Sequence, residues 1–319
     1  MSRTIIRPTS REEWLKQRER GIGSSEVGTI LGLNPFETPY QLWRRKMGMD
    51  EPKEENFAMR AGHYLEDAVS LFYRDATGKE IIKASAGDWI ICDNDRPYMR
   101  VSPDRTFWIP GLPKSASNKG ILECKTTQLT VDPDNLPQHW FCQLQYQLGV
   151  AGLPCGALAW LTMGRDFGYK DIAFDEEFFA WLTEEVERFW TDNIIGKQEP
   201  LLQNVDDVLL RYPKHFTGKT IEADEELISQ CAELREVKNA ISGLEARKKE
   251  IESAIKMAMG DAEAVVTEGA TPAKPKILCT WKTSKDSTKF DSKRFAAENP
   301  GLYGDYLYTV PGNRTFLLK

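Results

Sequence analysis

Along the first fifty residues, apolar positions recur at helical spacing and are interrupted by glycine or proline. This pattern predicts three short helices, within 10–20, 24–33 and 39–48. Ser10 or Thr9 is expected to cap the first helix, because a side-chain oxygen at that position accepts a backbone N–H of the first turn. Residues 10–48 are therefore predicted to be mainly helical.

A longer helix is predicted within 57–78 from apolar residues that return every three or four positions. Its core-facing side is expected to consist of Leu65, Val69, Leu71, Phe72 and Tyr73.

The middle of the chain alternates between strand and helix patterns. Strands are predicted at 80–84, 88–93, 99–109 and 120–127, the last two joined by a loop with hairpin chemistry. Beyond them we predict a helix within 136–152, a buried strand at 155–163, and a strand leading into a helix over 171–194. Strands interleaved with helices predict an α/β fold, more closely α+β, with a central mixed β-sheet flanked by helices.

The composition changes near residue 216, which predicts two domains, 1–215 and 216–319. In the second domain, apolar residues recur at intervals of three, four and seven over 224–260. This repeat predicts either one long amphipathic helix or a helical hairpin broken at Gly243. A turn or linker is expected at 268–276, and a small β appendage with a basic stretch after it.

The amino-acid composition excludes several classes of protein. A hydrophobic content of 41% and a charged content of 28% are those of a soluble globular protein. No apolar run reaches membrane-spanning length and the start lacks a signal-peptide core, so we expect a cytoplasmic protein without membrane contact. Six cysteines without CxxC spacing and three histidines disfavour zinc sites and disulfides. The net charge of −6 disfavours non-specific coating of nucleic acid, but it permits local positive charge.

The stretch ILECKTT carries the pattern that is most informative about chemistry. Strand geometry puts Glu123 and Lys125 on one face and Cys124 on the other. One interpretation is an exposed ion pair. The other is an active site, in which Asp104 after the preceding strand and Glu66 on the long helix add carboxylates beside the lysine. Such oxygen ligands suit Mg²⁺, which activates water and neutralises charge on a phosphate, while the lysine orients the water.

Five segments, taken in order, resemble the lambda-type exonuclease family, also called YqaJ-like viral recombinases, of the PD-(D/E)XK nuclease superfamily: WLKQRERGIGSSEVGTILGLNPF, AGHYLEDAV, SPDRTFW, ILECKTT and WFCQLQYQL. The resemblance implies a restriction-endonuclease-like core. It also implies digestion of one strand of duplex DNA from its 5′ end, dependent on Mg²⁺ or, in its place, Mn²⁺. The 3′ overhangs would serve phage recombination by single-strand annealing.

The same resemblance implies partners. Double-stranded DNA ends are the implied substrate, and a single-strand annealing protein is the implied protein partner. A homo-oligomer is implied as well, in the form of a trimer that encircles DNA.

By position, the resemblance implies a role for each residue of the proposed site. Asp104 and Glu123 would be metal ligands, Lys125 would act on the catalytic water, and Glu66 would be a helix acid near the metal. The backbone carbonyl of Cys124 would supply a further ligand.

The resemblance also implies a pocket for a 5′ phosphate, formed by Arg18 and Ser25, with Arg20 as the alternative to Arg18. Ser24 and Ser25 lie where a helix begins, and free N–H groups there attract anions. A plain N-cap role for Ser25 is the competing interpretation. Gln143 would contact the active-site region, or else it belongs to a polar surface face of its helix.

Two other functions fit the same residues. One is a structure-specific or restriction-type endonuclease with the same core, and the other is a non-catalytic DNA-binding scaffold of a recombination complex. Residues 216–319 are expected to extend a DNA channel, to make oligomer or partner contacts, or to form a solvated capping subdomain.

Overall fold

The computed structural model describes residues 2–50, 56–82, 89–162, 165–267, 276–310 and 312–319. The chain divides into two compact units, Met1–Arg211 and Tyr212–Lys319. Every residue that the sequence assigns to a site lies in the first unit. None of the helices in the described ranges is both long and apolar enough to cross a membrane.

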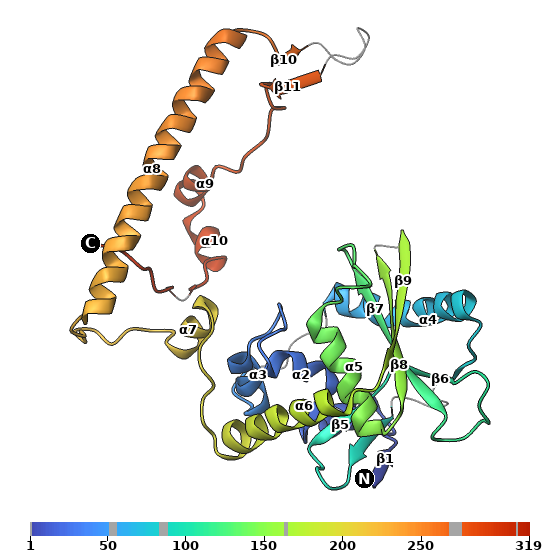
Figure 1. Cartoon of the computed structure of the whole chain (residues 1–319). Coiled ribbons are helices and arrows are strands. Elements are labelled where there is room, and N and C mark those ends of the chain that lie inside the picture. The colour runs from blue at the N-terminus through green and yellow to red at the C-terminus, as the bar shows by residue number, and fades with distance from the viewer. Residues whose placement is uncertain (1, 51–55, 83–88, 163–164, 268–275, 311) are drawn as a thin grey trace. The chain divides into compact units, whose positions relative to one another are not determined.

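The first unit contains helices and strands in alternation (Figure 1). Its helices are α1 (Arg11–Glu19), α2 (Ser24–Ile30), α3 (Pro39–Lys46), α4 (Phe57–Thr77), α5 (Gln138–Ala151), α6 (Glu176–Arg188) and α7 (Val205–Arg211), with a π-helical turn η1 (Phe189–Ile195). Its strands are β1 (Arg3–Ile6), β2 (Ile22–Gly23), β3 (Ile81–Ile82), β4 (Ile90–Asp93), β5 (Met99–Val101), β6 (Arg105–Trp108), β7 (Lys119–Thr127), β8 (Cys155–Thr162) and β9 (Asp166–Ala173).

The short helices start where the sequence signals place them, with one difference. Ser10 caps α1 and Thr38 caps α3 through their side chains, as predicted. The N-cap of α2 is Gly23, so Ser24 and Ser25 are the first two residues of the helix. The N-cap interpretation of Ser25 is therefore wrong.

The larger sheet is mixed and has the strand order β3-β6-β7-β8-β9. β7 and β8 pair in parallel, and the other neighbours pair antiparallel. The hairpin between β6 and β7 confirms the predicted loop. β7 is the central strand, so it is hydrogen-bonded on both sides and its side chains are held in fixed positions.

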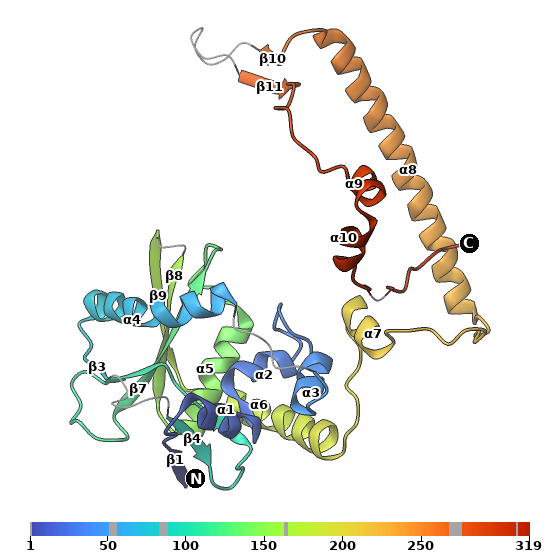
Figure 2. The ribbon, with the colours of Figure 1, turned by 180° about the vertical axis from the view of Figure 1, so that it is seen from behind.

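Helices cover both faces of this sheet, α4 on one and α5 on the other (Figures 1 and 2). On β7, Leu122 and Cys124 pack in a cluster with Val69 and Tyr73 of α4. Ile121 packs on the opposite face, against α5. This alternation confirms that Glu123 and Lys125 share one face and that Cys124 points to the other.

A second mixed sheet has the order β1-β4-β5-β2. The segment 99–109, predicted as one strand, is divided between the sheets: β5 belongs to the second sheet and β6 to the first. Pro103 lies between them, and proline cannot donate to a strand ladder. The expected central sheet is thus realised as two mixed sheets, and Asp104 lies at the bend that joins them.

The prediction for the inner face of α4 was right for two residues of five. Val69 and Tyr73 are fully buried, whereas Leu65, Leu71 and Phe72 are 36–48% exposed. A straight helix touches a sheet along one stripe, and residues four apart, such as 69 and 73, fall on that stripe.

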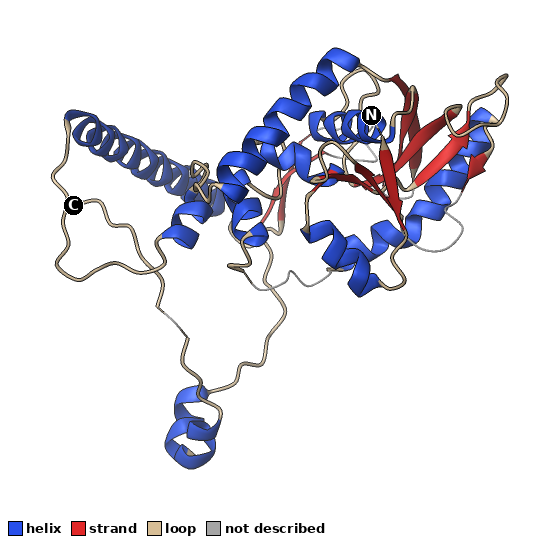
Figure 3. Cartoon of the chain, turned by 90° about the horizontal axis from the view of Figure 1, so that it is seen from below, coloured by secondary structure: helices blue, strands red, loops and turns tan. Residues whose placement is uncertain are grey.

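The second unit is built around one long helix, α8 (Glu225–Met259), which runs without a break (Figure 3). The hairpin interpretation at Gly243 is therefore wrong. The remaining elements are the antiparallel pair β10 (Ala264–Thr267) and β11 (Lys276–Thr280), and the helices α9 (Ser292–Glu298) and α10 (Pro300–Asp305). Residues 268–275 of the predicted linker, and residues 83–84, 88 and 163 of the predicted strands, lie outside the described residues.

Candidate active site

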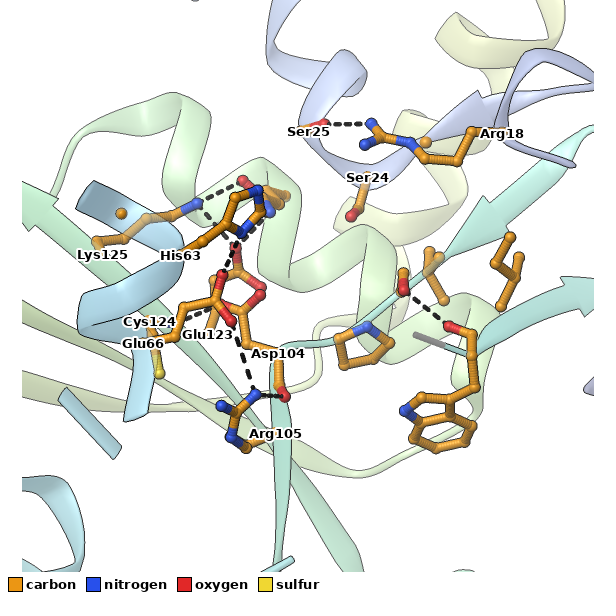
Figure 4. A pocket seen from close by; sticks show the side chains of 18 of the residues that line it. Arg18, Ser24, Ser25, His63, Glu66, Asp104, Arg105, Glu123, Cys124 and Lys125 are labelled. Carbon is orange, nitrogen blue, oxygen red and sulfur yellow. Dashed lines mark hydrogen bonds and ion pairs between the residues drawn. The ribbon is translucent and has the colours of Figure 1, made fainter. Parts of the chain in front are cut away.

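A cavity of about 610 Å³ opens in the first unit between the two sheets and helices α1, α2, α4 and α5. The sequence-predicted residues that line it are Arg18, Ser24, Ser25, Glu66, Asp104, Glu123, Cys124, Lys125 and Gln143. Figure 4 shows the Arg18–Ser25 pair on one side and the carboxylates with Lys125 on the other. Arg20 is exposed at the end of α1 and does not line the cavity.

Glu123 is the most enclosed of the carboxylates, with 3% of its surface exposed. Its Oε1 accepts hydrogen bonds from Lys125 Nζ at 2.8 Å and from Gln143 Nε2. Lys125 Nζ also donates to Gln143 Oε1 at 2.8 Å, which closes a three-residue ring. The Glu123–Lys125 pair is thus not an exposed ion pair, and Gln143, which is 9% exposed, does not lie on a surface helix face.

Asp104 reaches the same place from the bend between the sheets. Its Oδ2 accepts the backbone N–H of Cys124 at 2.8 Å, which ties the bend to the central strand. Burial raises the pKa of the Asp104 carboxyl well above its ordinary value, and the nearby charges of Glu123 and Glu66 raise it further. Like charges are therefore crowded at this end of the cavity.

Glu66 enters the cavity from α4. Its Oε1 lies 3.0 Å from His63 Nδ1, and its Oε2 lies 3.7 Å from the guanidinium of Arg105. Arg105 is also paired with Asp67 at 2.6 Å. Glu66 is therefore held by a histidine and an arginine, and it lies at the edge of the cluster of three acidic side chains.

The thiol of Cys124 belongs to the apolar cluster under α4, and burial raises its pKa well above the usual value. A protonated, buried thiol is a poor ligand. The predicted contribution of Cys124 through its backbone carbonyl stays a prediction.

The donor set suits a hard divalent cation, since carboxylate oxygens are the ligands that Mg²⁺ prefers. Within the described ranges, however, no three His, Cys, Asp or Glu side chains form a group that could hold a metal ion as they stand. Each carboxylate is engaged by protein donors instead, Glu123 by Lys125 and Gln143 and Asp104 by a backbone N–H. An entering cation would have to replace some of these hydrogen bonds.

The opposite side of the cavity carries the positive charge and hydrogen-bond donors that would bind an anion. Arg18 donates from Nη2 to Ser25 Oγ at 3.1 Å, and its guanidinium lies 4.7 Å from the centre of the Trp14 ring. Stacking on an aromatic face holds an arginine in a defined orientation. Five cationic side chains and three acidic ones line the cavity, although the whole chain carries a net charge of −6: Arg11, Arg18, Arg100, Arg105 and Lys125 against Glu66, Asp104 and Glu123.

Gln147 connects the two sides, and sequence reasoning missed it. Its Nε2 donates to Glu123 Oε2 at 2.8 Å and to Ser24 Oγ at 3.2 Å. The residue is fully buried. Gln143 and Gln147 are one helical turn apart, and this spacing of two amides on one face of α5 is the signal that could have found it.

A buried ion pair fixes the start of α2. Lys46 Nζ donates to Glu26 Oε2 at 2.8 Å and to the carbonyl oxygen of Gly21 at 2.6 Å, and both side chains are 5% exposed. Glu26 Oε2 also accepts the N–H of Gly23 at 2.8 Å. Burial lowers the pKa of Lys46, while Lys46, Arg45 and Arg18 together lower that of Glu26 against the opposing effect of burial. Sequence reasoning did not find this pair, because its members are 20 residues apart on different helices.

The chain is similar to a known family of proteins. Residues 13–154 match the YqaJ-like viral recombinase domain. The uncharacterized protein YqaJ of Bacillus subtilis (strain 168) is 30% identical over 308 residues, which cover 92% of this chain and 90% of that protein.

Similar solved structures include an alkaline exonuclease, LHK-Exo, from Laribacter hongkongensis. It has 16% sequence identity and a TM-score of 0.43, and the match covers 58% of this chain and 93% of that chain. A phage-related exonuclease from Haemophilus somnus 129PT has 12% identity and a TM-score of 0.40, with 56% and 96% of the two chains covered.

Proposed function

Because this chain belongs to the YqaJ-like viral recombinase family, we propose that it is a Mg²⁺-dependent deoxyribonuclease that digests one strand of duplex DNA from the 5′ end. One observation carries the proposal. The three carboxylates, Lys125 and the Arg18–Ser25 pair line one cavity, although they come from helices α1, α2 and α4, strand β7 and the bend before β6.

Glu66, Asp104 and Glu123 are the residues that would hold the cation, with the Cys124 carbonyl as a further ligand. The crowding of negative charge that raises the Asp104 pKa supports this assignment, because a divalent cation would relieve it. When bound, the ion supplies an activated water and neutralises charge on the scissile phosphate. Mn²⁺ is the expected substitute.

Lys125 and Gln143 act on the reacting groups in this proposal. The ammonium lies 2.8 Å from both Glu123 and Gln143, so it is held in place before substrate arrives. A fixed positive charge of this kind orients the attacking water and stabilises the charge that develops on the phosphate. Gln143 contacts both the ammonium of Lys125 and the carboxylate of Glu123, and so helps to hold the two groups in position.

Arg18 and Ser25 would bind the terminal 5′ phosphate on the far side of the cavity. An arginine held by stacking on Trp14 can present two parallel N–H groups to a phosphate. Binding the end of a strand on one side and cutting next to it on the other supports an exonuclease rather than a restriction-type endonuclease. A non-catalytic scaffold is disfavoured, because the carboxylates of Glu123 and Asp104 line one cavity beside Lys125, an arrangement that binding of DNA alone does not require.

The product would be a 3′ single-stranded overhang for phage-type recombination by single-strand annealing. An annealing protein is the proposed partner, and a trimer around the DNA is the proposed assembly. Residues 216–319 would contribute DNA, oligomer or partner contacts.

The substrate is tested with linear duplexes that carry a 5′ phosphate or a 5′ hydroxyl, and with covalently closed circles, each with and without Mg²⁺. We expect digestion of the phosphorylated linear duplex in Mg²⁺, slower digestion of the hydroxyl form, and intact circles. Cutting of closed circles at a comparable rate would favour the endonuclease, and no Mg²⁺-dependent cutting of any substrate would refute the proposal.

Arg18→Ala tests the phosphate pocket in the same assay. The loss of a charge-assisted hydrogen bond of about 1.5–3 kcal/mol should reduce the preference for the 5′ phosphate by about 10- to 100-fold. Arg20→Ala is the matched control, since Arg20 is two residues away and does not line the cavity. If Arg20→Ala reduces the preference and Arg18→Ala does not, the pocket is assigned to the wrong arginine.

A further inference from the structure

Two buried glutamines of helix α5, Gln145 and Gln147, use their amides in different ways. Gln145 donates from Nε2 to the Ala173 carbonyl at 2.8 Å, and its Oε1 accepts the Asp175 N–H at 3.0 Å. Both partners are backbone groups away from the cavity, so Gln145 has a structural role where β9 meets α6. Gln147, two residues later, instead contacts two side chains that line the cavity.

The amide of Gln147 is satisfied at one end only. Its Nε2 donates to Glu123 Oε2 at 2.8 Å and to Ser24 Oγ at 3.2 Å. Because an ionised carboxylate can only accept, the contact with Glu123 fixes which end of the amide faces it. The Oε1 atom is buried without a hydrogen-bond partner in the part of the chain that the structure describes. Such an acceptor costs free energy, so stability does not explain a glutamine at this position.

The hydrogen bond from Gln147 determines what the Ser24 hydroxyl can do. A hydroxyl has one hydrogen to donate and two lone pairs with which to accept. Because Oγ accepts from Gln147, the hydrogen is left for an anion in the cavity that Ser24 lines. Ser24 is next to Ser25, which pairs with Arg18 in the proposed 5′-phosphate pocket (Figure 4). Ser24 can therefore donate to a phosphate in that pocket while it still accepts from Gln147.

The packing of α2 on α5 holds Ser24 and Gln147 together. Gly28 of α2 lies against His139 of α5, so close that a Cβ on Gly28 would come within 2.6 Å of the His139 Cβ. A side chain at this position would force the two helices apart. The buried Glu26–Lys46 ion pair also fixes the start of α2, where Ser24 lies. The contact between the two residues is thus made by helices that are held in place.

From these contacts we infer that Gln147 is a positioning residue that makes the rate of cleavage depend on the 5′ phosphate. A phosphate that accepts from Ser24 polarises the hydroxyl, whose oxygen then accepts more strongly from Gln147. The amide in turn holds Oε2 of Glu123, whose other oxygen accepts from Lys125 and Gln143. The inference rests on the proposed nuclease function, and it adds that a phosphate at the strand end speeds the chemical step.

Single-turnover rates at saturating protein test this inference, because the affinity for DNA then no longer contributes. The measured quantity is the phosphate preference: the rate in Mg²⁺ on a duplex with a 5′ phosphate, divided by the rate on the same duplex with a 5′ hydroxyl. Gln147→Leu should lower this preference by about 10-fold, the effect of losing one hydrogen bond to a charged group. If the leucine variant fails to fold in urea unfolding, Gln147→Met takes its place.

Gln145→Leu is the matched control, since it removes a buried amide from the same helix. It should leave the phosphate preference unchanged, even where urea unfolding shows that it is the less stable variant. An unchanged preference in the Gln147 variant, or an equal fall in both variants, overturns the inference.

A double-mutant cycle shows whether Ser24 and Gln147 act together. Ser24→Ala removes the acceptor but leaves the contact between Gln147 and Glu123, and it should also lower the phosphate preference. The double variant Ser24→Ala with Gln147→Leu should lose no more than the larger of the two single losses, because the residues form one connection. Single losses that multiply in the double variant contradict the inference, as does an unchanged preference in Ser24→Ala.

The wild-type chain separates failure of this inference from failure of the proposed function. If it cleaves neither duplex in Mg²⁺, the nuclease function is refuted and the role of Gln147 falls with it. If it cleaves both duplexes at the same saturated rate, the nuclease function stands and only the role of Gln147 is refuted.

Discussion

Lys125→Met is expected to lower the rate of Mg²⁺-dependent DNA hydrolysis by a factor of about 10² to 10⁴. Methionine is unbranched and only one atom shorter than lysine, but it lacks the ammonium that contacts Glu123 and Gln143 at 2.8 Å. Single-turnover digestion of a 5′-phosphorylated linear duplex measures the chemical step, and a separate binding assay shows that the substrate still binds. Glu123→Gln should cause a loss of the same order, since a neutral amide is a weak ligand for a divalent cation.

Lys170→Met is the matched control for this experiment. Lys170 also lies on a strand of the same sheet and is paired with a carboxylate, Asp134, at 2.9 Å, but it does not line the cavity. Its replacement should leave the hydrolysis rate unchanged. An undiminished rate in Lys125→Met, with the control also unaffected, would remove Lys125 from the catalytic site.

Lys46→Met is expected to lower the free energy of unfolding by about 3–5 kcal/mol. The change leaves Glu26 buried without its closest cation, and it removes the donor to the carbonyl of Gly21. The double variant Glu26→Gln with Lys46→Met should recover part of the loss, because the buried charge is then gone as well. Urea unfolding followed by tryptophan fluorescence measures both.

Lys16→Met is the control for this experiment, because it breaks an ion pair that is exposed to solvent rather than buried. Lys16 and Glu12 are 2.7 Å apart, but their side chains are 67% and 77% exposed, so the loss should not exceed about 1 kcal/mol. If Lys46→Met is no more destabilising than Lys16→Met, the pair with Glu26 does not hold α2 in place.

Much of the fold was predictable because it depends on local patterns. The caps Ser10 and Thr38, the hairpin between β6 and β7 and the opposite directions of Glu123 and Cys124 follow from residues within a few positions of one another. The predictions of secondary structure were wrong where contacts between distant segments override the local pattern. Segment 99–109 alternates like one strand, yet the bend at Pro103 assigns its halves to two different sheets.

The site was predictable in part for the same reason. Period-two geometry alone aligns Glu123 with Lys125, and one helical turn separates Gln143 from Gln147. Nothing local indicates that Gln147 would also reach Ser24, or that Lys46 would be buried against Glu26. Those contacts exist only because α2 packs on α5 and α3 on α2.

The sequence by itself identified the family through the resemblance of five segments. Composition and short-range spacing determined most of the helix and strand types and the candidate residues of the proposed site, because these depend on neighbouring positions. Only the tertiary structure decided that Arg18 rather than Arg20 lines the cavity and that the Glu123–Lys125 pair is enclosed. The physical reason is that burial and contact between distant segments depend on how elements pack, and packing is a property of the whole chain rather than of any window along it.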